Sequence, residues 1–210
     1  MAIVGLAVGA AIATAHQSTI DRLAAVVGGE PIFLSDVREV VRLRLLDPAG
    51  ALAPLVDAPG ASEESRALVR MINRRLVLAE VARYSQAPPP AADVAAAEKA
   101  WAARFDAVPA RDPAFVRAFL IDTLRIDRYI DQRFTAAAQP TRDEARAYFD
   151  ANPARFSRAG APARFEDVED EARNRLAEER RLAMVREWLD ALRERGNVRV
   201  VGTLVRGSGG

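Results

Sequence analysis

The sequence contains no cysteine, one histidine and one lysine. Without cysteine the chain forms no disulfide and no thiolate metal site, and it offers no thiol nucleophile. A catalytic triad would have to use His16, and a histidine metal cluster is impossible. We therefore predict no catalytic residue, no metal ligand and no cofactor.

The sequence also lacks a complete phosphate-binding motif. The glycines that suggest one are Gly28 and Gly29, in the stretch AVVGGEPIFLSDV. A dinucleotide fingerprint needs a third spaced glycine at the start of the helix, and a P-loop needs Gly-Lys-Ser/Thr there. The lysine of this chain is Lys99, far from the glycine pair. The pair therefore predicts a tight turn.

Neither sign of charge is in excess. The 210 residues include 30 basic and 29 acidic side chains, which gives a net charge of +1. This balance argues against a general nucleic-acid or membrane-surface binder. The arginines alternate with acids along the expected helices, which indicates a solvated surface of ion pairs. Pairs of carboxylates are available for acid–base chemistry, but surface ion pairs are the favoured interpretation of them too. With 50% hydrophobic residues, the chain is long enough for one sizeable core or two small ones.

No hydrophobic run is long enough to span a bilayer stably. Residues 2–15, AIVGLAVGAAIATA, are uncharged but too short to cross about 30 Å of hydrocarbon. They suit the apolar region of a signal peptide, and Ala13-Thr14-Ala15 has the small-x-small pattern of a cleavage site. We expect residues 1–15 to be removed, leaving a periplasmic chain that begins at His16. The basic n-region is absent, so an upstream start codon, an N-terminal membrane anchor and a buried helix remain alternatives.

The beginning of the mature chain predicts a β-hairpin followed by a helix. Leu23–Val27 and Ile32–Phe33 flank the turn residues Gly28–Pro31. Ser35 is then expected to cap the first helix, with Asp36 at the positive end of its dipole. A loop rich in Pro, Ala and Gly follows up to Ala61.

Periodic apolar residues predict four further helices before the last one. Three are expected at residues 63–84, 91–105 and 113–134, the third with Asp112 as its N-cap. The fourth opens at the capping box Thr141–Glu144 and stops at Asn152-Pro153. In the first of these, Met71, Leu78 and Val81 widen the apolar stripe until the helix is apolar nearly all round, which predicts a central position. Its inward residues are expected to be Leu68, Ile72, Leu76 and Ala79. In the helix of residues 113–134 we expect Val116, Leu120, Ile130 and Phe134 inward, with Phe119 and Ile126 on the flank.

The last predicted helix, residues 166–195, carries two separate apolar patches. Charged residues 178–181 lie between them, so we expect the helix to contact two bodies, or one body over part of its length. Glu169 with Arg173 and Glu171 with Arg175 are expected to pair along it at i,i+4 spacing. Gly196 is placed as a C-cap, and residues 197–201, NVRVV, predict a closing strand. Residues 24–27 and 198–201 should pair in one small sheet, because each is too short to stand alone. We expect the tail, residues 202–210, to be disordered.

Five segments, in their order along the chain, resemble the N-terminal chaperone region of the SurA family of periplasmic folding factors and its parvulin-type relatives. The likeness extends from Ile20 to Val201 and implies a mostly α-helical SurA-N-like chaperone domain with a small β-sheet of N- and C-terminal strands. The segments are AAVVGGEPIFLSDV, MINRRLVLAEVARY, DPAFVRAFLIDTLRIDRYIDQRF, PTRDEARAYFDANPARF and EDEARNRLAEERRLAMVREWLDALRERGNVRVV.

The sequence departs from this family at one point. Relatives with isomerase activity carry a parvulin domain of about 100 residues before the returning helix. Here only Ser157–Arg164 occupies that place. The resemblance therefore implies client binding without prolyl isomerase activity.

The resemblance implies unfolded proteins, outer-membrane proteins among them, as partners. Core packing is the favoured interpretation of Trp101 and Phe105, with an exposed client site as the alternative. The candidate client-binding residues are Trp101, Phe105, Phe119, Tyr148 and Phe149. Two other functions stay open: a peptidyl-prolyl isomerase-related protein, and a non-catalytic adaptor for one fixed partner. No nucleic-acid partner is expected, and no oligomeric state is predicted.

Overall fold

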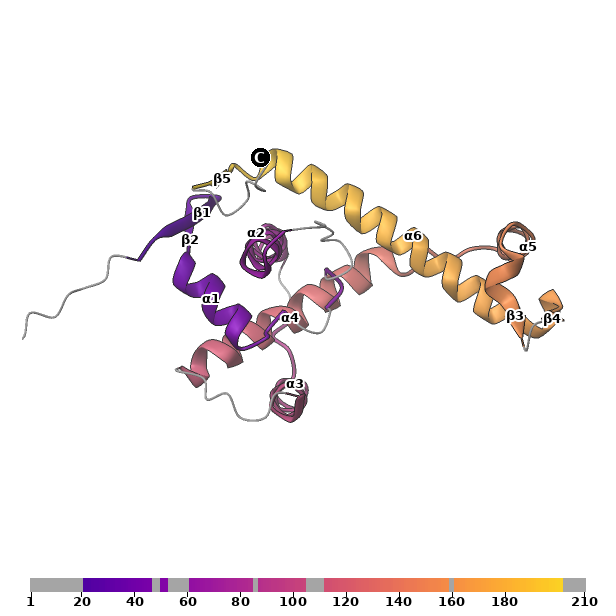
Figure 1. Ribbon diagram of the computed structural model, residues 1–210, viewed down its shortest axis with the longest axis horizontal. Coiled ribbons are helices and arrows are strands. Elements are labelled where there is room, and N and C mark those ends of the chain that lie inside the picture. Colours follow the sequence, from indigo (N-terminus) through magenta and orange to yellow (C-terminus); the bar gives the residue numbers. More distant parts are fainter. Residues whose placement is uncertain are drawn as a thin grey trace, which may run out of the picture.

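The computed structural model describes residues 21–46, 50–52, 61–84, 87–104, 112–158 and 161–201. The expected signal peptide, Phe105 and the tail from residue 202 lie outside the described residues. Within these ranges no helix has the length and apolar character needed to cross a membrane. The elements are β1 (Leu23–Val27), β2 (Glu30–Phe33), α1 (Leu34–Arg42), α2 (Glu63–Val81), α3 (Ala91–Arg104), α4 (Pro113–Phe134), α5 (Arg142–Ala151), the 3-10 helix η2 (Pro153–Phe156), β3 (Ser157–Arg158), β4 (Ala161–Pro162), α6 (Phe165–Arg195) and β5 (Val198–Val200) (Figure 1).

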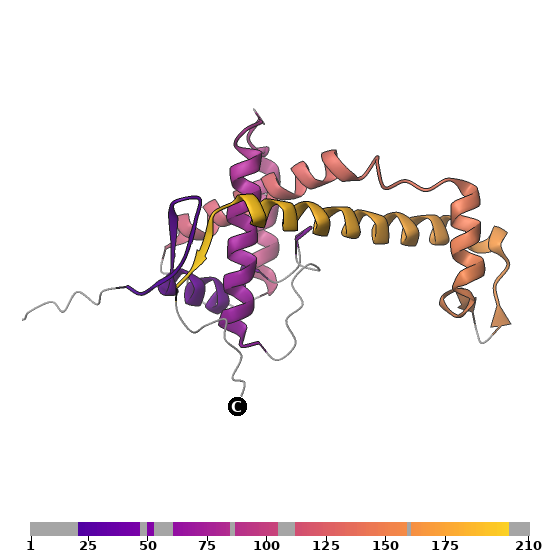
Figure 2. The ribbon, with the colours of Figure 1, turned by 90° about the horizontal axis from the view of Figure 1, so that it is seen from above.

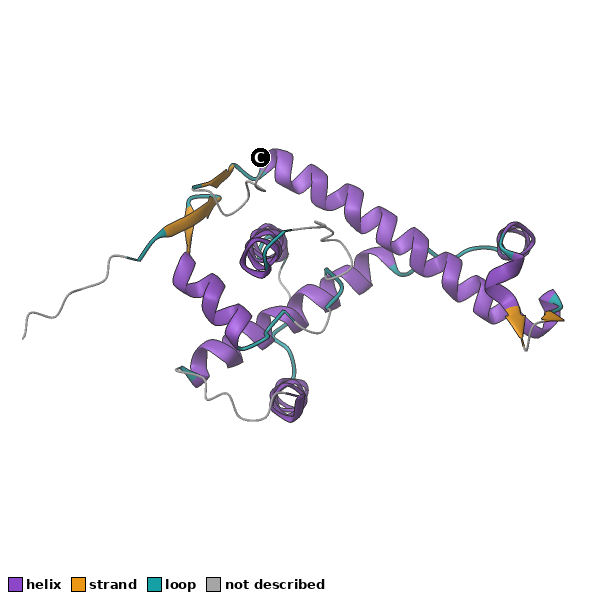
Figure 3. Cartoon of the chain, in the orientation of Figure 1, coloured by secondary structure: helices purple, strands orange, loops and turns teal. Residues whose placement is uncertain are grey.

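A small antiparallel sheet joins the first strands of the described chain to the last. Its order is β2-β1-β5, and Ala25 of β1 pairs with Val200 of β5. Figure 3 shows these strands together at one side of a mostly helical body. The predicted pairing of residues 24–27 with residues 198–201 is therefore confirmed, and so is the mostly α fold class.

The glycine pair forms the two-residue turn between β1 and β2. Val27 pairs with Glu30, and Gly28 and Gly29 have φ angles of 59° and 92°. A two-residue hairpin turn of this kind requires positive φ at both positions, and glycine adopts it without steric strain. The predicted turn is confirmed.

The predicted cap of the first helix is wrong. Helix α1 begins at Leu34, and the amide of Phe33 donates to Asp36 Oδ2 over 3.3 Å. Ser35 lies inside the first turn, where its hydroxyl donates to Asp21. The helix begins two residues early because the Leu34 side chain is buried and its amide donates to the carbonyl of Arg22.

Helix α2 is central to the main body, as predicted. It contacts β1, α1, α4 and α6, and its residues Leu68, Ile72 and Leu76 are buried in the core that these elements share. One detail of this prediction is wrong. Ala79 is exposed, because the buried face of the helix follows the 3.6-residue period through Val77 and Val81.

One detail of the prediction for α4 is also wrong. Ile126 is fully buried in the shared core, whereas it was expected on the flank of the helix.

Helix α6 joins two bodies, which confirms one of the two arrangements that its patches predicted. Its C-terminal half packs into the main core through Val185, Trp188, Leu189 and Leu192. Its N-terminal half packs against α5 and η2 in a second cluster, formed by Ala145, Phe156, Phe165, Val168 and Ala172. Figure 2 shows the helix extending from the main body to α5 and the short β3–β4 hairpin.

Candidate functional site

A groove lies between α2 and α4 on the surface of the main body, with a volume of about 280 Å³. Each helix contributes residues at positions i, i+3, i+4 and i+7, which is the spacing of a single helical face. We call it the α2–α4 groove. It is lined by Met71, Arg74, Arg75 and Leu78 of α2, by Phe115, Ala118, Phe119 and Asp122 of α4, and by Asp36 of α1.

The apolar residues of the groove are partly exposed because α2 has more apolar surface than the core uses. Leu68, Ile72 and Leu76 fill the core, whereas Met71 and Leu78 lie on the neighbouring face and are half-buried. When a ligand covers a partly exposed apolar side chain, binding is favoured by roughly 25 cal/mol for each Å² of apolar surface that is removed from water. The apolar residues of α2 therefore lie on two faces, one packed into the core and one open to the groove.

Two phenylalanines form the α4 side of the groove. Phe115 and Phe119 lie one helical turn apart, with ring centroids 6.4 Å apart, and both are half-buried. Beneath them is a cluster of buried residues from α1, α4 and the turn after α1, against which Trp101 of α3 also packs. The rings are thus held from below and open on the groove side.

Arg74 brings a positive charge into this apolar surface. Its guanidinium donates to the Phe119 carbonyl and to Thr123 Oγ1, each over 3.0 Å, and lies 3.8 Å from the Phe119 ring centroid. Burial lowers the pKa of Arg74 to about 10, although the carboxylates of Asp122 and Asp127 act in the opposite direction. The group stays protonated at neutral pH in surroundings that solvate it poorly.

The other charged residues of the groove are compensated by neighbours. Arg75 forms an ion pair with Glu30, and Asp122 lies 3.5 Å from Arg125. Asp36 accepts the Phe33 amide and occupies the first turn of α1, where the helix dipole favours a negative charge. Among the described residues, no carboxylate lies within 4.0 Å of the Arg74 guanidinium nitrogens.

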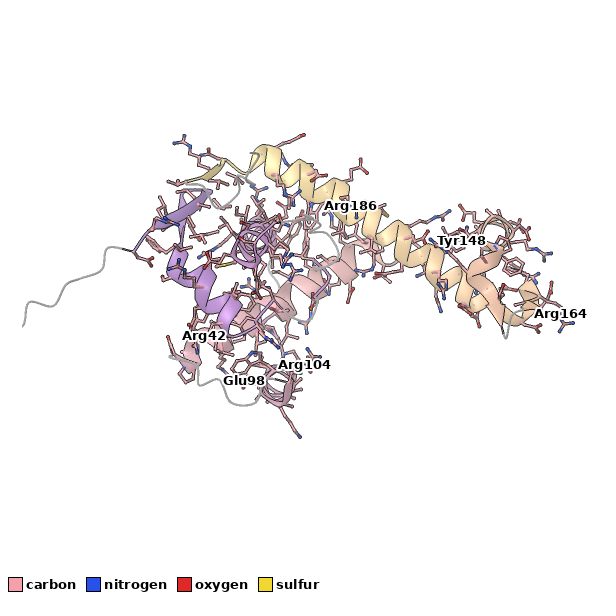
Figure 4. The ribbon with its side chains drawn as sticks, viewed as in Figure 1. Arg42, Glu98, Arg104, Tyr148, Arg164 and Arg186 are labelled. Carbon is pink, nitrogen blue, oxygen red and sulfur yellow. The ribbon has the colours of Figure 1, made fainter. Side chains whose placement is uncertain are left out.

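The structure places the predicted client-binding residues in two separate clusters. Phe119 lines the groove, and Trp101 packs nearby while its indole N–H donates to the Leu43 carbonyl over 2.9 Å. Tyr148 and Phe149 lie in the second cluster, beyond the main body. Figure 4 shows Tyr148 at the far end of α6, well apart from Glu98 of α3.

In the second cluster the two aromatic residues connect α5 to its neighbours. The Phe149 ring lies 5.3 Å from that of Phe156. The Tyr148 hydroxyl donates to Glu179 of α6 over 2.7 Å and accepts from Arg155 over 2.6 Å. This arrangement gives both residues a packing role, and client binding by them stays a prediction.

Met71, Phe115 and Leu78 are site residues that the sequence did not identify as such. Their spacing was the available signal, because a second apolar face on an already amphipathic helix indicates a second contact surface. Within the described ranges, no three acidic or histidine side chains are close enough together to hold a metal ion.

No known protein family matches the sequence, and no curated protein matches it. The fold is SurA-like. A solved chain matches with a TM-score of 0.55 and 12% identity, over 87% of this chain and 100% of that chain. It comes from a study of the virulence factor PEB4 and the periplasmic protein Cj1289 of Campylobacter jejuni, described as two structurally related SurA-like chaperones.

Proposed function

We propose that this protein is a periplasmic chaperone or assembly factor that holds unfolded client proteins, outer-membrane proteins among them. The observation that supports the proposal is a partly exposed apolar groove on a SurA-like fold. Burial of client side chains against Met71, Leu78 and the two phenylalanines is non-directional, so many sequences can bind. A volume of about 280 Å³ accommodates a few side chains and no folded domain.

We further propose that the protein has no prolyl isomerase activity. The barrier to rotation about the peptide bond is about 20 kcal/mol, and lowering it requires a preorganised cleft around the amide. Residues 157–164 join η2 to α6, and their described part contains two paired two-residue strands followed by the two residues that lead into α6. A segment of this length supports the proposal because it is too short to build such a cleft.

Export to the periplasm belongs to the same proposal. It is supported by the leader sequence and by the small residues before His16. N-terminal sequencing of protein recovered from a Gram-negative periplasm should start at His16. Cytosolic protein that begins at Met1 would contradict export, and a membrane fraction with an intact leader would favour the anchored alternative.

One preparation of the mature chain tests binding and catalysis together. Light scattering should show reduced aggregation of an unfolded client, and a protease-coupled assay with a proline peptide should show no acceleration of isomerisation. Isomerase activity that persists through repurification would contradict the second statement. Undiminished aggregation at several-fold molar excess would favour an adaptor for one fixed partner.

A matched pair of variants locates the binding surface. Ala118 and Ala183 are both exposed and both lie inside helices, but Ala118 lines the groove whereas Ala183 lies on α6 outside it. Ala118→Gln fills the groove without touching the core, so it should weaken aggregation suppression several-fold. Ala183→Gln should leave it unchanged. Equal behaviour of the two variants would move the binding site away from the groove.

A further inference from the structure

The charge of Arg74 distinguishes the α2–α4 groove from a purely apolar surface. Arg75 pairs with Glu30, Asp122 lies next to Arg125, and Asp36 is stabilised by the start of α1. Arg74 has two neutral acceptors and an aromatic face, but no carboxylate of the described residues within ion-pair distance. The carboxylates of Asp122 and Asp127 act on the Arg74 charge electrostatically but form no ion pair with it. A ligand carboxylate in direct contact with the guanidinium would therefore stabilise this poorly solvated charge further.

We infer that the groove binds client segments in which an acidic side chain lies between apolar side chains, with its carboxylate held by Arg74. This inference rests on the proposed function and specifies its substrate class. The preference arises because the Arg74 guanidinium makes two hydrogen bonds to the protein and has further N–H donors available for a carboxylate.

The position of Arg74 within the groove indicates a side-chain carboxylate and not a chain terminus. Met71 and Leu78 lie on either side of Arg74 along α2 and are about 10 Å apart at 1.5 Å per residue. In an extended peptide the side chains at positions i−2, i and i+2 point to the same face and span about 13 Å. An acidic residue with an apolar residue two positions away on each side can therefore contact Arg74 and both apolar ends of the groove. A terminal carboxylate at Arg74 would leave half of the groove empty.

The test compares fluorescently labelled apolar peptides that differ in one central residue, Glu or Gln, both with amidated C-termini. Fluorescence anisotropy should give a dissociation constant about tenfold lower for the Glu peptide, as expected for one hydrogen-bonded charge pair. A third peptide carries Gln at the centre and a free C-terminal carboxylate, and it should bind like the amidated Gln peptide.

Substitutions inside and outside the groove then assign the preference to one residue. Arg74→Met should bring the Glu and Gln peptides to within about twofold of each other. Arg38→Met should keep the discrimination, because Arg38 of α1 is not part of the groove lining and pairs with Glu64. Circular dichroism identifies variants that do not fold, and in that case Arg74→Lys provides the second measurement. It keeps the charge without the planar fork, so the discrimination should be reduced but present.

The outcomes separate this inference from the proposed function. Equal binding of the Glu and Gln peptides to the unmodified protein overturns the role of Arg74 and leaves client binding intact. Tight binding of the free-terminus peptide overturns the assignment to a side chain. Loss of binding for all three peptides, together with undiminished client aggregation, overturns the proposed function itself.

Discussion

Asn73 of α2 accepts two hydrogen bonds from Arg193 of α6, over 3.1 Å from Nε and 2.9 Å from Nη2. Asn73 has no exposed surface, whereas Arg193 lies at the edge of the core and also contacts Asp190. The pair joins the central helix to the long helix that carries α5. If the contact is lost, the Arg193 guanidinium can bind water instead, whereas the buried Asn73 side chain cannot.

Arg193→Met should lower the free energy of unfolding by about 1–3 kcal/mol, because the Asn73 carbonyl oxygen would lose its donors where water cannot replace them. Asp190→Asn removes the other contact of Arg193, at an exposed site, and should change the free energy of unfolding by less than about 1 kcal/mol. Urea denaturation of the two variants measures both values. Equal losses would contradict a special role for the buried Asn73.

The hairpin turn provides a second test. Gly29 has a φ of 92°, a conformation that an alanine side chain adopts only with strain. Gly29→Ala should lower the free energy of unfolding by about 1–2 kcal/mol, whereas Gly29→Asn should have a smaller effect because asparagine tolerates positive φ better. Chemical denaturation compares the two. Indistinguishable stabilities would mean that the turn relaxes when glycine is replaced.

Gly196 at the end of α6 is required for a different reason. Its φ is −83°, so its conformation suits any residue, but an added Cβ would lie 2.8 Å from the Leu192 carbonyl oxygen and even closer to the buried Leu76 side chain. Gly196→Ala should therefore lower the free energy of unfolding by about 1–3 kcal/mol through overpacking. Its neighbour Asn197 has a φ of 43°, and Asn197→Gly should be neutral or slightly stabilising. Thermal unfolding of both variants distinguishes a steric from a conformational requirement.

Apart from the pairing of β1 with β5, the features that the sequence predicted well depend on neighbouring residues. The Thr141–Glu144 capping box, the Asp112 cap and the pairs of Glu169 with Arg173 and Glu171 with Arg175 are all present. Each is decided within one helical turn, where residue type and spacing are sufficient.

The features that sequence did not predict depend on distant contacts. Trp188 lies against Tyr129 and Phe134, with centroid distances of 5.7 and 5.5 Å, and this packing exists only once α6 returns to α4. The α2–α4 groove also exists only once helices that are distant in the sequence have packed together. An apolar face on α2 shows that some contact is needed, but only the positions of α1, α4 and α6 decide which face remains open.

The contact between α5 and α6 should respond to acid. Hydrogen bonds from Arg180, together with those of Thr141, lower the pKa of Glu144 from its usual 4.5 to about 2. Tyr148 and Arg155 lower the pKa of Glu179 in the same way. A carboxyl group with a depressed pKa in the folded state stabilises the fold above its unfolded pKa and loses that contribution as the pH falls through its folded pKa.

Amide protection factors of α5, corrected for intrinsic exchange, should therefore decline as the pH is lowered from about 4.5 toward 2. Arg180→Gln should reduce the protection of α5 at neutral pH and flatten this decline. Arg181→Gln is the matched control, because Arg181 pairs with Glu178 inside α6 and does not bridge to α5. If both variants kept the acid response of the unmodified chain, Glu144 and Arg180 would not be what holds α5 against α6.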